Sequence, residues 1–333
     1  MINKIHIQGF KCFDDEEFVL TPFTLLSGLN SSGKSTFLQA VRLMYEKSSL
    51  SALGPVSELV STLHKKMSIT LTSSGGDYLF EYPESKNYDY PFVEPVIAAY
   101  ISAARLGPEL YLPVSQEEER GFSVGEKGEF VLDFLEHHSE LAGLPDILRR
   151  REANSSSVRN NVSAWLGVIS PGIKMEWMAI PKADLIRAEY SGHRPNNVGF
   201  GISYALPIIA NVLVYAALVA NGEQESTLLM IENPEAHLHP AGQTQLGEFL
   251  ARAASCGVQI VVETHSDHLL NGIRLAVKNT ILKAVDSTFY YFNYDFDEER
   301  TSVQQPIIDD DGFFDEWPDG FFDETEKNLG RIL

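Results

Sequence analysis

The chain has 333 residues, 44% of them hydrophobic, which is enough for a buried core and excludes an intrinsically disordered protein. The formal net charge is −20, but residues 286–333 hold 14 acidic and 3 basic side chains, so the remainder is much closer to neutral. Nucleic-acid backbones are bound through lysine and arginine. This balance therefore argues against wrapping DNA over a broad surface and leaves room for a local basic groove.

Several features predict a cytoplasmic protein without a membrane segment. Residues 1–10 alternate polar and apolar side chains like a strand and lack the pattern of a secretory signal. The longest apolar run, residues 205–220, contains Pro207 and Asn211 and is shorter than the roughly 20 residues that cross a bilayer, so it predicts a buried helix. Cys12 and Cys256 have no metal-ligand spacing and predict neither a disulfide framework nor a zinc site.

Hydrophobic periodicity predicts an α/β fold with a mostly parallel sheet and flanking helices. In the N-terminal part we expect a helix at about 34–45 and strands at 4–10, 23–26, 68–72, 78–82 and 96–102. The middle, 113–197, predicts a helical insertion with helices at 129–142 and 155–165. From residue 203 the predicted order is a helix, a strand at 227–231, a helix at 240–254, a strand at 258–264, a helix at 267–277 and a strand at 288–293.

A glycine-rich segment satisfies the P-loop pattern between the second predicted strand and the first predicted helix. It runs Gly28-Leu29-Asn30-Ser31-Ser32-Gly33-Lys34-Ser35-Thr36. Its glycines let the backbone N–H groups face phosphates, and Lys34 is expected to bridge the β- and γ-phosphates of ATP. Ser35 is expected to give its hydroxyl to Mg²⁺ and Thr36 to contact the α-phosphate. The alternative is a glycine-rich turn with a chance lysine.

A second apolar strand ends in Glu232, as expected of a sheet that delivers a carboxylate to Mg²⁺ beside a P-loop. The residues that follow are Asn233-Pro234-Glu235-Ala236-His237-Leu238-His239-Pro240. This segment resembles the Walker B region of ABC-type ATPases in the family of SMC, RecF and OLD proteins. The resemblance implies ATP binding and hydrolysis.

The chain departs from that family's pattern after the metal-binding acid. The family places Asp-Glu there, with the Glu polarising the attacking water, whereas this chain has Glu232-Asn233. An amide orients water but cannot accept its proton, so either hydrolysis is slow or Glu235 is the base. Glu235 could instead be a carboxylate that stabilises a helix start. His237 and His239 fit packing or capping better than metal binding, because the spacing gives no two-histidine helical face.

Two further segments extend the resemblance. His265 ends the predicted strand at 258–264 and matches the switch histidine of ABC ATPases, which senses the γ-phosphate; a core histidine is the alternative. Residues 197–204 resemble a degenerate ABC signature loop, in which Gly201 allows close approach and Ser203 caps the next helix and offers its hydroxyl. An ordinary helix cap is the alternative. In that family the signature loop grips the ATP of the other subunit, which implies a head-to-tail homodimer.

Four other features have open interpretations. Arg105, in a segment that resembles AAA-labelled relatives of this clan, is expected either to contact phosphate or signal across the interface, or to form a structural ion pair. The tail at 311–324, with its Trp-Pro-Asp-Gly-Phe-Phe-Asp-Glu, resembles a bacterial subgroup of these ATPases and either docks on the body or a partner or packs on itself. We cannot assign a Q-loop. The insertion is the most basic region of the chain, which suggests either that it binds DNA or that its arginines lie on a solvated helix face. These arginines are Arg149, Arg150, Arg151, Arg159, Arg187 and Arg194.

The sequence thus predicts an ABC-type P-loop ATPase head that binds ATP and Mg²⁺. The resemblance to its family further implies that the protein dimerises and regulates an effector protein in a bacterial DNA-handling or anti-phage defence system. The remaining sequence is too short for the Toprim nuclease domain that OLD proteins append. Expected parts are an N-terminal lobe at 1–112, the insertion at 113–197, a C-terminal lobe at 198–285 and an acidic aromatic tail at 286–333. The rival functions are a hydrolysis-poor nucleotide sensor or scaffold, suggested by Asn233, and a small-molecule P-loop kinase.

Overall fold

The computed structural model describes residues 1–45, 53–83, 96–115, 123–295 and 300–332. It divides into two compact units, one formed by residues 1–96, 284–309 and 313–333, the other by residues 97–283 and 310–312. The first unit therefore combines the N-terminal and C-terminal parts of the sequence, and the second contains the middle. The fold is α/β, as the sequence predicts.

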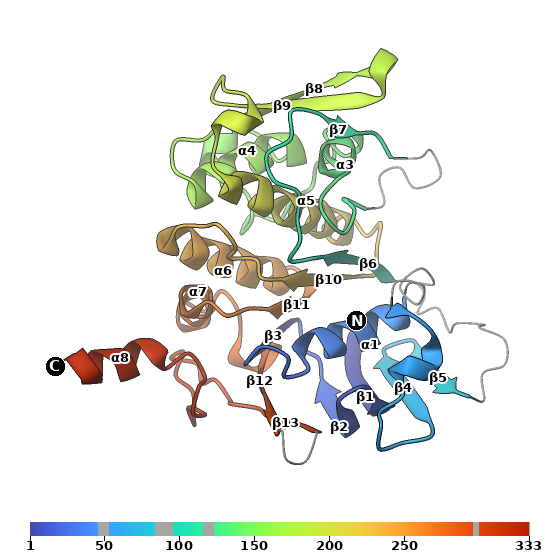
Figure 1. The fold of residues 1–333 in the computed structure, drawn as a ribbon. Helices are drawn as coiled ribbons and strands as arrows, with labels where there is room; N and C mark the ends of the chain where they lie inside the picture. Colours follow the sequence, from blue (N-terminus) through green and yellow to red (C-terminus); the bar gives the residue numbers. More distant parts are fainter. Residues whose placement is uncertain (46–52, 84–95, 116–122, 296–299, 333) are drawn as a thin grey trace. The chain divides into compact units, whose positions relative to one another are not determined.

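The first unit contains an antiparallel sheet and a set of three further strands (Figure 1). The antiparallel sheet has the order β2-β1-β4-β5, formed by β1 (Ile2–Phe10), β2 (Phe13–Val19), β4 (Met67–Ser73) and β5 (Gly76–Tyr82). The other three are β3 (Phe23–Gly28), β12 (Ser287–Asp295) and β13 (Arg300–Gln304). β12 pairs parallel with β3 and antiparallel with β13. The helices of this unit include α1 (Lys34–Leu43) and α8 (Glu324–Ile332).

Aromatic side chains form the core of the first unit. Phe18 on β2 lies 4.8 Å from Phe37 on α1 and 5.8 Å from Phe292 on β12, measured between ring centroids, and all three are buried. The helix α1 contacts both β1 and β3. The strand that carries the P-loop is thus packed against a strand from the far end of the sequence.

The C-terminal tail packs on its own unit. Phe321 is fully buried, and its ring lies 5.4 Å from that of Phe314 and 5.9 Å from that of Tyr291 on β12. Trp317 joins this cluster at 5.3 Å from both Phe314 and Phe321. The tail at 311–324 thus packs on itself through Phe314, Trp317 and Phe321, and it also docks on the body through Tyr291 of β12.

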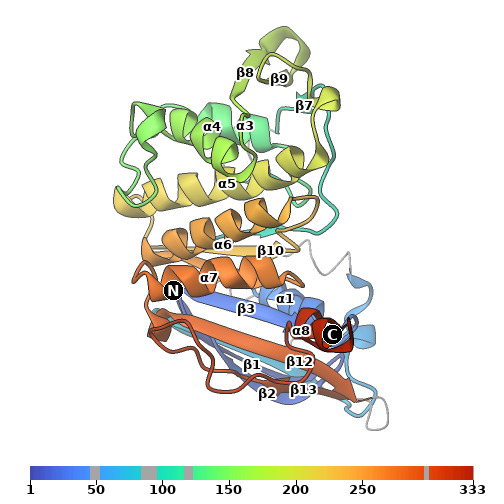
Figure 2. The ribbon, with the colours of Figure 1, turned by 90° about the vertical axis from the view of Figure 1, so that its left-hand side faces the viewer.

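The second unit is mostly helical, with strand order β11-β10-β6 in one sheet and β7-β9-β8 in another (Figure 1). Its helices include α4, α5, α6 and α7 (Figure 2), and both α5 and α6 contact β11. The strands are β6 (Val96–Ile101), β7 (Leu112–Pro113), β8 (Met175–Ile180), β9 (Leu185–Tyr190), β10 (Ser226–Glu232) and β11 (Val258–Glu263). The helices are α3 (Val131–His137), α4 (Val158–Ile169), α5 (Phe200–Ala220), α6 (Pro240–Ser255) and α7 (Asp267–Lys278).

The range 113–197 is only partly helical, which corrects the expectation of a helical insertion. It contains α3 and α4, but β8 and β9 pair antiparallel through the register Met175↔Tyr190 to Ile180↔Leu185. Side chains of β9 alternate between buried and half-buried, a period of two that belongs to a strand.

The helix α5 is long and apolar enough to cross a membrane by length and composition, yet 78% of its most apolar window is buried inside the protein. It is therefore a core helix of this unit, as predicted. Its interior Pro207 is accommodated next to Asn211, whose amide donates to the Pro207 carbonyl at 2.9 Å.

Candidate nucleotide site

The P-loop follows β3 and leads into α1, as the sequence predicts. Gly28 has φ 143° and Gly33 has φ 108°, conformations that L side chains rarely adopt. A Cβ on Gly28 would lie 2.1 Å from the carbonyl oxygen of Phe292, and one on Gly33 would lie 3.0 Å from Thr301 Oγ1. Both glycines are therefore required by the packing of the loop as well as by its backbone conformation.

Lys34 is the chemical centre of this loop. Its ammonium donates to the carbonyl of Gly28 at 3.0 Å and to that of Leu29 at 2.7 Å, and the residue is only 3% exposed. The side chain is therefore folded back over the loop instead of extending into solvent. A buried cation at this position can exchange carbonyl oxygens for phosphate oxygens, which bind an ammonium more strongly.

The rest of the loop also suits an anion. The hydroxyl of Ser32 is buried and has no hydrogen-bond partner among the described residues, an arrangement that costs free energy unless a ligand supplies the partner. α1 has no capping side chain and no acidic residue in its first turn, so its positive end is not neutralised locally. Asn30, Ser31 and Ser35 are exposed, and Thr36 is half-buried. The predicted ligands are thus accessible on one loop.

The acidic half of the predicted site lies in the second unit. β10 and β11 run parallel, and their last residues, Glu232 and Glu263, stand directly opposite in the register. Glu232 accepts a hydrogen bond from the Ala103 N–H at 3.1 Å. The sequence analysis missed Glu263, a buried carboxylate whose signal is its place at the end of a wholly buried strand. Two carboxylates therefore meet at one edge of this sheet.

Glu235 and His265 are brought together although 30 residues separate them. The backbone N–H of His265 donates to Glu235 Oε1 at 3.0 Å, while Glu235 Oε2 is buried and makes no hydrogen bond among the described residues. Burial raises the pKa of Glu235. α6 has no acidic residue in its first turn, so Glu235 does not stabilise that helix start. His265 itself is exposed.

Asn233 begins the tight turn that follows β10. It has φ 43°, a left-handed conformation that asparagine tolerates better than most residues, and its N–H donates to the Glu263 carbonyl at 2.8 Å. Its side-chain Oδ1 is buried and makes no hydrogen bond among the described residues. The turn thus fixes the backbone of Asn233, while its side-chain Oδ1 can still accept a hydrogen bond.

The two histidines of the next turn pack and cap, as predicted. His239 Nδ1 accepts a hydrogen bond from the Ala241 N–H at 3.3 Å and caps α6. The ring of His237 lies 4.6 Å from that of Tyr204 and 5.4 Å from that of Phe200. Across the described residues, no group of three His, Cys, Asp or Glu side chains could hold a metal ion. A metal at this site would need oxygens from a bound phosphate as further ligands.

The segment that resembles a signature loop forms the start of α5. Its cap is Gly199, and Ser203 lies within the first turn, so the expectation that Ser203 caps the helix is wrong. Ser203 instead lines a small cavity with Pro195 and Leu206. Gly201 does permit close approach, because a Cβ there would lie 2.7 Å from the His237 carbonyl oxygen. The start of α5 is thus packed on the turn that carries Glu235.

Arg105 connects the end of β10 with the start of α5. Its guanidinium donates to the carbonyls of Glu232 at 2.8 Å and Asn233 at 2.6 Å, and lies 5.0 Å from the ring centroid of Tyr204 on α5. Burial lowers the pKa of Arg105 to about 10, although the nearby carboxylates of Glu235 and Glu232 act in the opposite direction and raise it. Arg105 therefore holds backbone carbonyls, a role that neither of its two predicted interpretations describes.

Replacing Arg105 with lysine is expected to lower the free energy of unfolding by about 2–4 kcal/mol, because an ammonium cannot reach all the carbonyls that the planar fork holds. Denaturant titration of the variant measures this loss. Arg252→Lys is the matched control, since the one ion pair of Arg252 among the described residues is a long contact, 3.9 Å, with Glu248. A loss below about 0.5 kcal/mol for Arg105→Lys would contradict this role.

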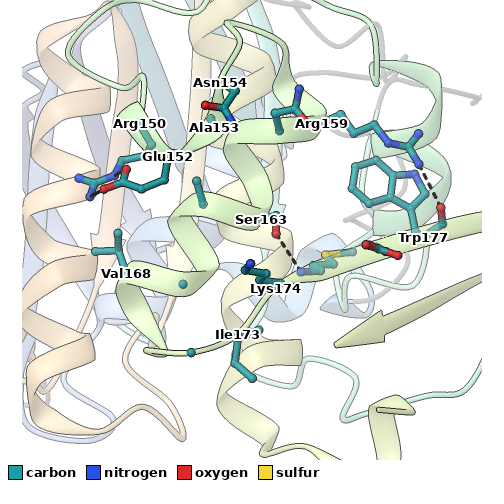
Figure 3. Close-up of a pocket in the computed structure, with 16 residues that line it drawn as sticks. Arg150, Glu152, Ala153, Asn154, Arg159, Ser163, Val168, Ile173, Lys174 and Trp177 are labelled. Carbon is teal, nitrogen blue, oxygen red and sulfur yellow. Dashed lines mark hydrogen bonds and ion pairs between the residues drawn. The ribbon is translucent and has the colours of Figure 1, made fainter. Parts of the chain in front are cut away.

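The insertion carries a groove of about 960 Å³ between α4 and β8 (Figure 3). The two arginines that line it are engaged: Arg159 donates to the Trp177 carbonyl at 3.1 Å and stacks on that ring, and Arg150 pairs with Glu152 at 3.4 Å. Elsewhere in the insertion Arg149 pairs with Asp146 and Arg187 with Glu189. Four arginines of the insertion, Arg149, Arg150, Arg159 and Arg187, thus face a carboxylate, which disfavours phosphate binding through them.

A P-loop of this geometry and a parallel-strand edge that ends in carboxylates define the class of P-loop ATPases. A family model described as "AAA ATPase domain" matches residues 1–87 and 160–270, more than half of the chain. The chain belongs to this AAA ATPase domain family. Residues 282–332 also match a family described as a protein of unknown function, DUF3696. No curated protein matches the chain significantly.

Solved structures confirm the fold. An SMC head domain with an extended coiled coil, bound to the C-terminal domain of ScpA and derived from Pyrococcus furiosus, is 14% identical with a TM-score of 0.56, over 99% of both chains. An SmcHead bound to the C-winged helix domain of ScpA is 14% identical with a TM-score of 0.55, over 92% of this chain and 97% of that one. At these identities the similarity establishes the architecture of an SMC-type head.

Proposed function

We propose that the protein binds ATP and Mg²⁺ at the P-loop and hydrolyses ATP with Glu235 as the general base. The proposal rests mainly on the two carboxylate oxygens of Glu235. Oε1 accepts a hydrogen bond from the His265 N–H at 3.0 Å, and the buried Oε2 makes no hydrogen bond among the described residues. A carboxylate whose pKa is raised by burial accepts a proton better than an ordinary glutamate. Asn233 orients the attacking water, and His265 senses the γ-phosphate.

The nucleotide-binding roles follow from the loop. Lys34 neutralises the β- and γ-phosphates, Thr36 contacts the α-phosphate, and the backbone from Gly28 to Gly33 supplies N–H donors. The buried Ser32 hydroxyl and the uncapped start of α1 support an anionic ligand here. Ser35 and Glu232 are the proposed ligands of Mg²⁺, which shields the phosphate charges when bound.

The second part of the proposal is that ATP closes a head-to-tail homodimer in which the first turn of α5 binds the nucleotide of the partner. This turn has no capping side chain and no acid, and Gly199 and Phe200 are exposed. An uncapped helix start of this kind suits the γ-phosphate. Gly201 and Ser203 belong to the same turn.

Gly199 offers a sharp test of dimerisation. Its φ is −70°, and a Cβ there would meet no atom within 4 Å, so a side chain fits without strain. Gly199→Glu places a carboxylate where the partner's phosphate is proposed to bind and is expected to abolish the ATP-dependent dimer while leaving the affinity of the monomer for ATP unchanged. Gly199→Gln has nearly the same shape without the charge and should weaken the dimer far less.

The solution mass of both variants in the presence of ATP and Mg²⁺ measures this difference. Equal dimerisation of the glutamate and glutamine variants would contradict a role of this turn in holding phosphate. Phosphate release by the wild-type protein above the rate of a Lys34→Ala variant tests hydrolysis itself. Equal rates would instead support the hydrolysis-poor nucleotide sensor or scaffold, the alternative that the amide of Asn233 favours.

We further propose that the ATPase regulates an effector protein in a bacterial DNA-handling or anti-phage defence system. The SMC heads of similar fold were solved with a bound domain of ScpA, which supports a protein partner. Direct DNA binding is less well supported, because four of the six arginines named in the insertion are paired with carboxylates. Co-purification of a partner that is lost in the Lys34→Ala variant tests this role.

A further inference from the structure

The C-terminal segment contacts the P-loop at both of its glycines. The carbonyl oxygen of Phe292 on β12 lies 2.1 Å from the position that a Cβ on Gly28 would take. Thr301 on β13 places its hydroxyl 3.0 Å from the position of a Cβ on Gly33. Both strands belong to the segment 282–332, which matches a family of unknown function. The part of the chain without an assigned role therefore forms one wall of the nucleotide-binding loop.

Thr301 makes the more specific of these contacts. Its hydroxyl donates to the carbonyl of Ser32 at 3.0 Å, its backbone N–H donates to the carbonyl of Cys12 at 3.2 Å, and the residue is 3% exposed. Strand pairing with β12 needs only the backbone of β13. The side-chain hydroxyl is thus directed at the P-loop in addition to the strand's own pairing.

This hydrogen bond fixes the orientation of one peptide group. The Ser32–Gly33 peptide bond is trans, so the Ser32 carbonyl and the Gly33 N–H lie in one plane and point in opposite directions. A hydroxyl that holds the carbonyl on one side therefore determines where the N–H points on the other. The backbone N–H groups of a P-loop are the donors that cradle phosphates.

We propose that Thr301 is a positioning residue for the nucleotide, acting through the Ser32–Gly33 peptide, and that the β12–β13 segment thereby makes the C-terminal module part of the ATP site. The inference rests on the proposed binding of ATP at the P-loop. It assigns a role to a residue that lies outside the sequence motifs of the nucleotide site.

The test compares Thr301→Val with Thr301→Ser. Valine keeps the shape and loses the hydroxyl, leaving the buried Ser32 carbonyl without this partner, whereas serine keeps the donor. We expect Thr301→Val to raise the Kd for both ATP and ADP about tenfold. It should also raise the KM for ATP with kcat nearly unchanged. Thr301→Ser should bind both nucleotides within about twofold of the wild type.

Titration calorimetry on the 333-residue chain measures the affinities of the wild type and both variants for the two nucleotides. If Thr301→Val does not fold, Thr301→Ala takes its place against Thr301→Ser. Binding by the hydroxyl-free variant within twofold of the wild type, or equal losses in the serine variant, would overturn the inference. Failure of the proposed function is seen separately, because Lys34→Ala would then bind ATP as well as the wild type.

Discussion

A Lys34→Ala variant is expected to lose ATP affinity by at least about 100-fold while remaining folded. The Lys34 ammonium is buried and donates to the carbonyls of Gly28 and Leu29. Its proposed partners in the complex are two phosphate groups, and charge-assisted hydrogen bonds of this kind contribute about 1.5–3 kcal/mol each. Losing both explains a decrease of two orders of magnitude or more in the binding constant.

Titration calorimetry with ATP and Mg²⁺ measures this loss, and Lys11→Ala is the matched control. Lys11 lies in the same unit, and its ammonium donates to Gln39 on α1 at 2.7 Å. Removing it changes the net charge by the same amount without touching the P-loop. A comparable loss of affinity in both variants would show that general electrostatic attraction, and not the P-loop lysine, binds the nucleotide.

The second large effect is expected for Glu235→Gln, which should lower kcat for ATP hydrolysis by about 100-fold to 1,000-fold with little change in ATP affinity. A positioned base contributes about 10²–10⁴ to a rate, and glutamine keeps the acceptor for the His265 N–H but cannot take a proton. Phosphate release under saturating ATP measures kcat. A rate within threefold of the wild type would exclude Glu235 as the base.

Glu248→Gln is the matched control for this variant, because Glu248 lies on α6 in the same unit and makes only a long contact with Arg252. It should leave kcat unchanged. The two glutamate variants remove the same charge, so a difference between them reports the position of the carboxylate.

The raised pKa of Glu235 adds a pH dependence to both activity and stability. Hydrolysis should fall as the pH is lowered through this raised pKa, because the base must be deprotonated. The folded protein favours the protonated form, so the stability that Glu235 contributes is present below its ordinary pKa and is lost as the pH rises through the raised one. Glu235→Gln should therefore melt at a higher temperature than the wild type at pH 7.5, and this difference should shrink towards pH 4.

The sequence motifs predicted those parts of the site that depend on local chemistry. The P-loop combines two glycines, a lysine and a flanking strand and helix, and this local pattern predicts the loop conformation and the helix that follows it. The structure contains both, at Gly28–Gly33 and in α1. The strand ends near Glu232 and His265 are also predictable, because mostly apolar runs end there; β10 ends at Glu232 and β11 ends at Glu263, two residues before His265. His239 capping followed from its place before Pro240.

The missed features depend on tertiary contacts. β2 was missed because its sequence, Phe-Asp-Asp-Glu-Glu-Phe-Val, is mostly charged and buries only Phe13 and Phe18. Serine favours helix caps, which predicts Ser203 as the cap of α5, yet Gly199 is the cap and Gly201 packs against the His237 carbonyl. The contact between Thr301 and Ser32 joins residues 269 positions apart and has no signature in the sequence.

The solution mass of Glu235→Gln with and without ATP and Mg²⁺ tests the central claim most directly. The variant is expected to bind ATP without consuming it, so the 37.1 kDa chain should shift to about twice this mass when ATP is added. The same measurement on Glu235→Gln combined with Gly199→Glu should show no shift. A mass that is independent of ATP, at nucleotide concentrations where calorimetry shows saturation, would contradict nucleotide-driven dimerisation.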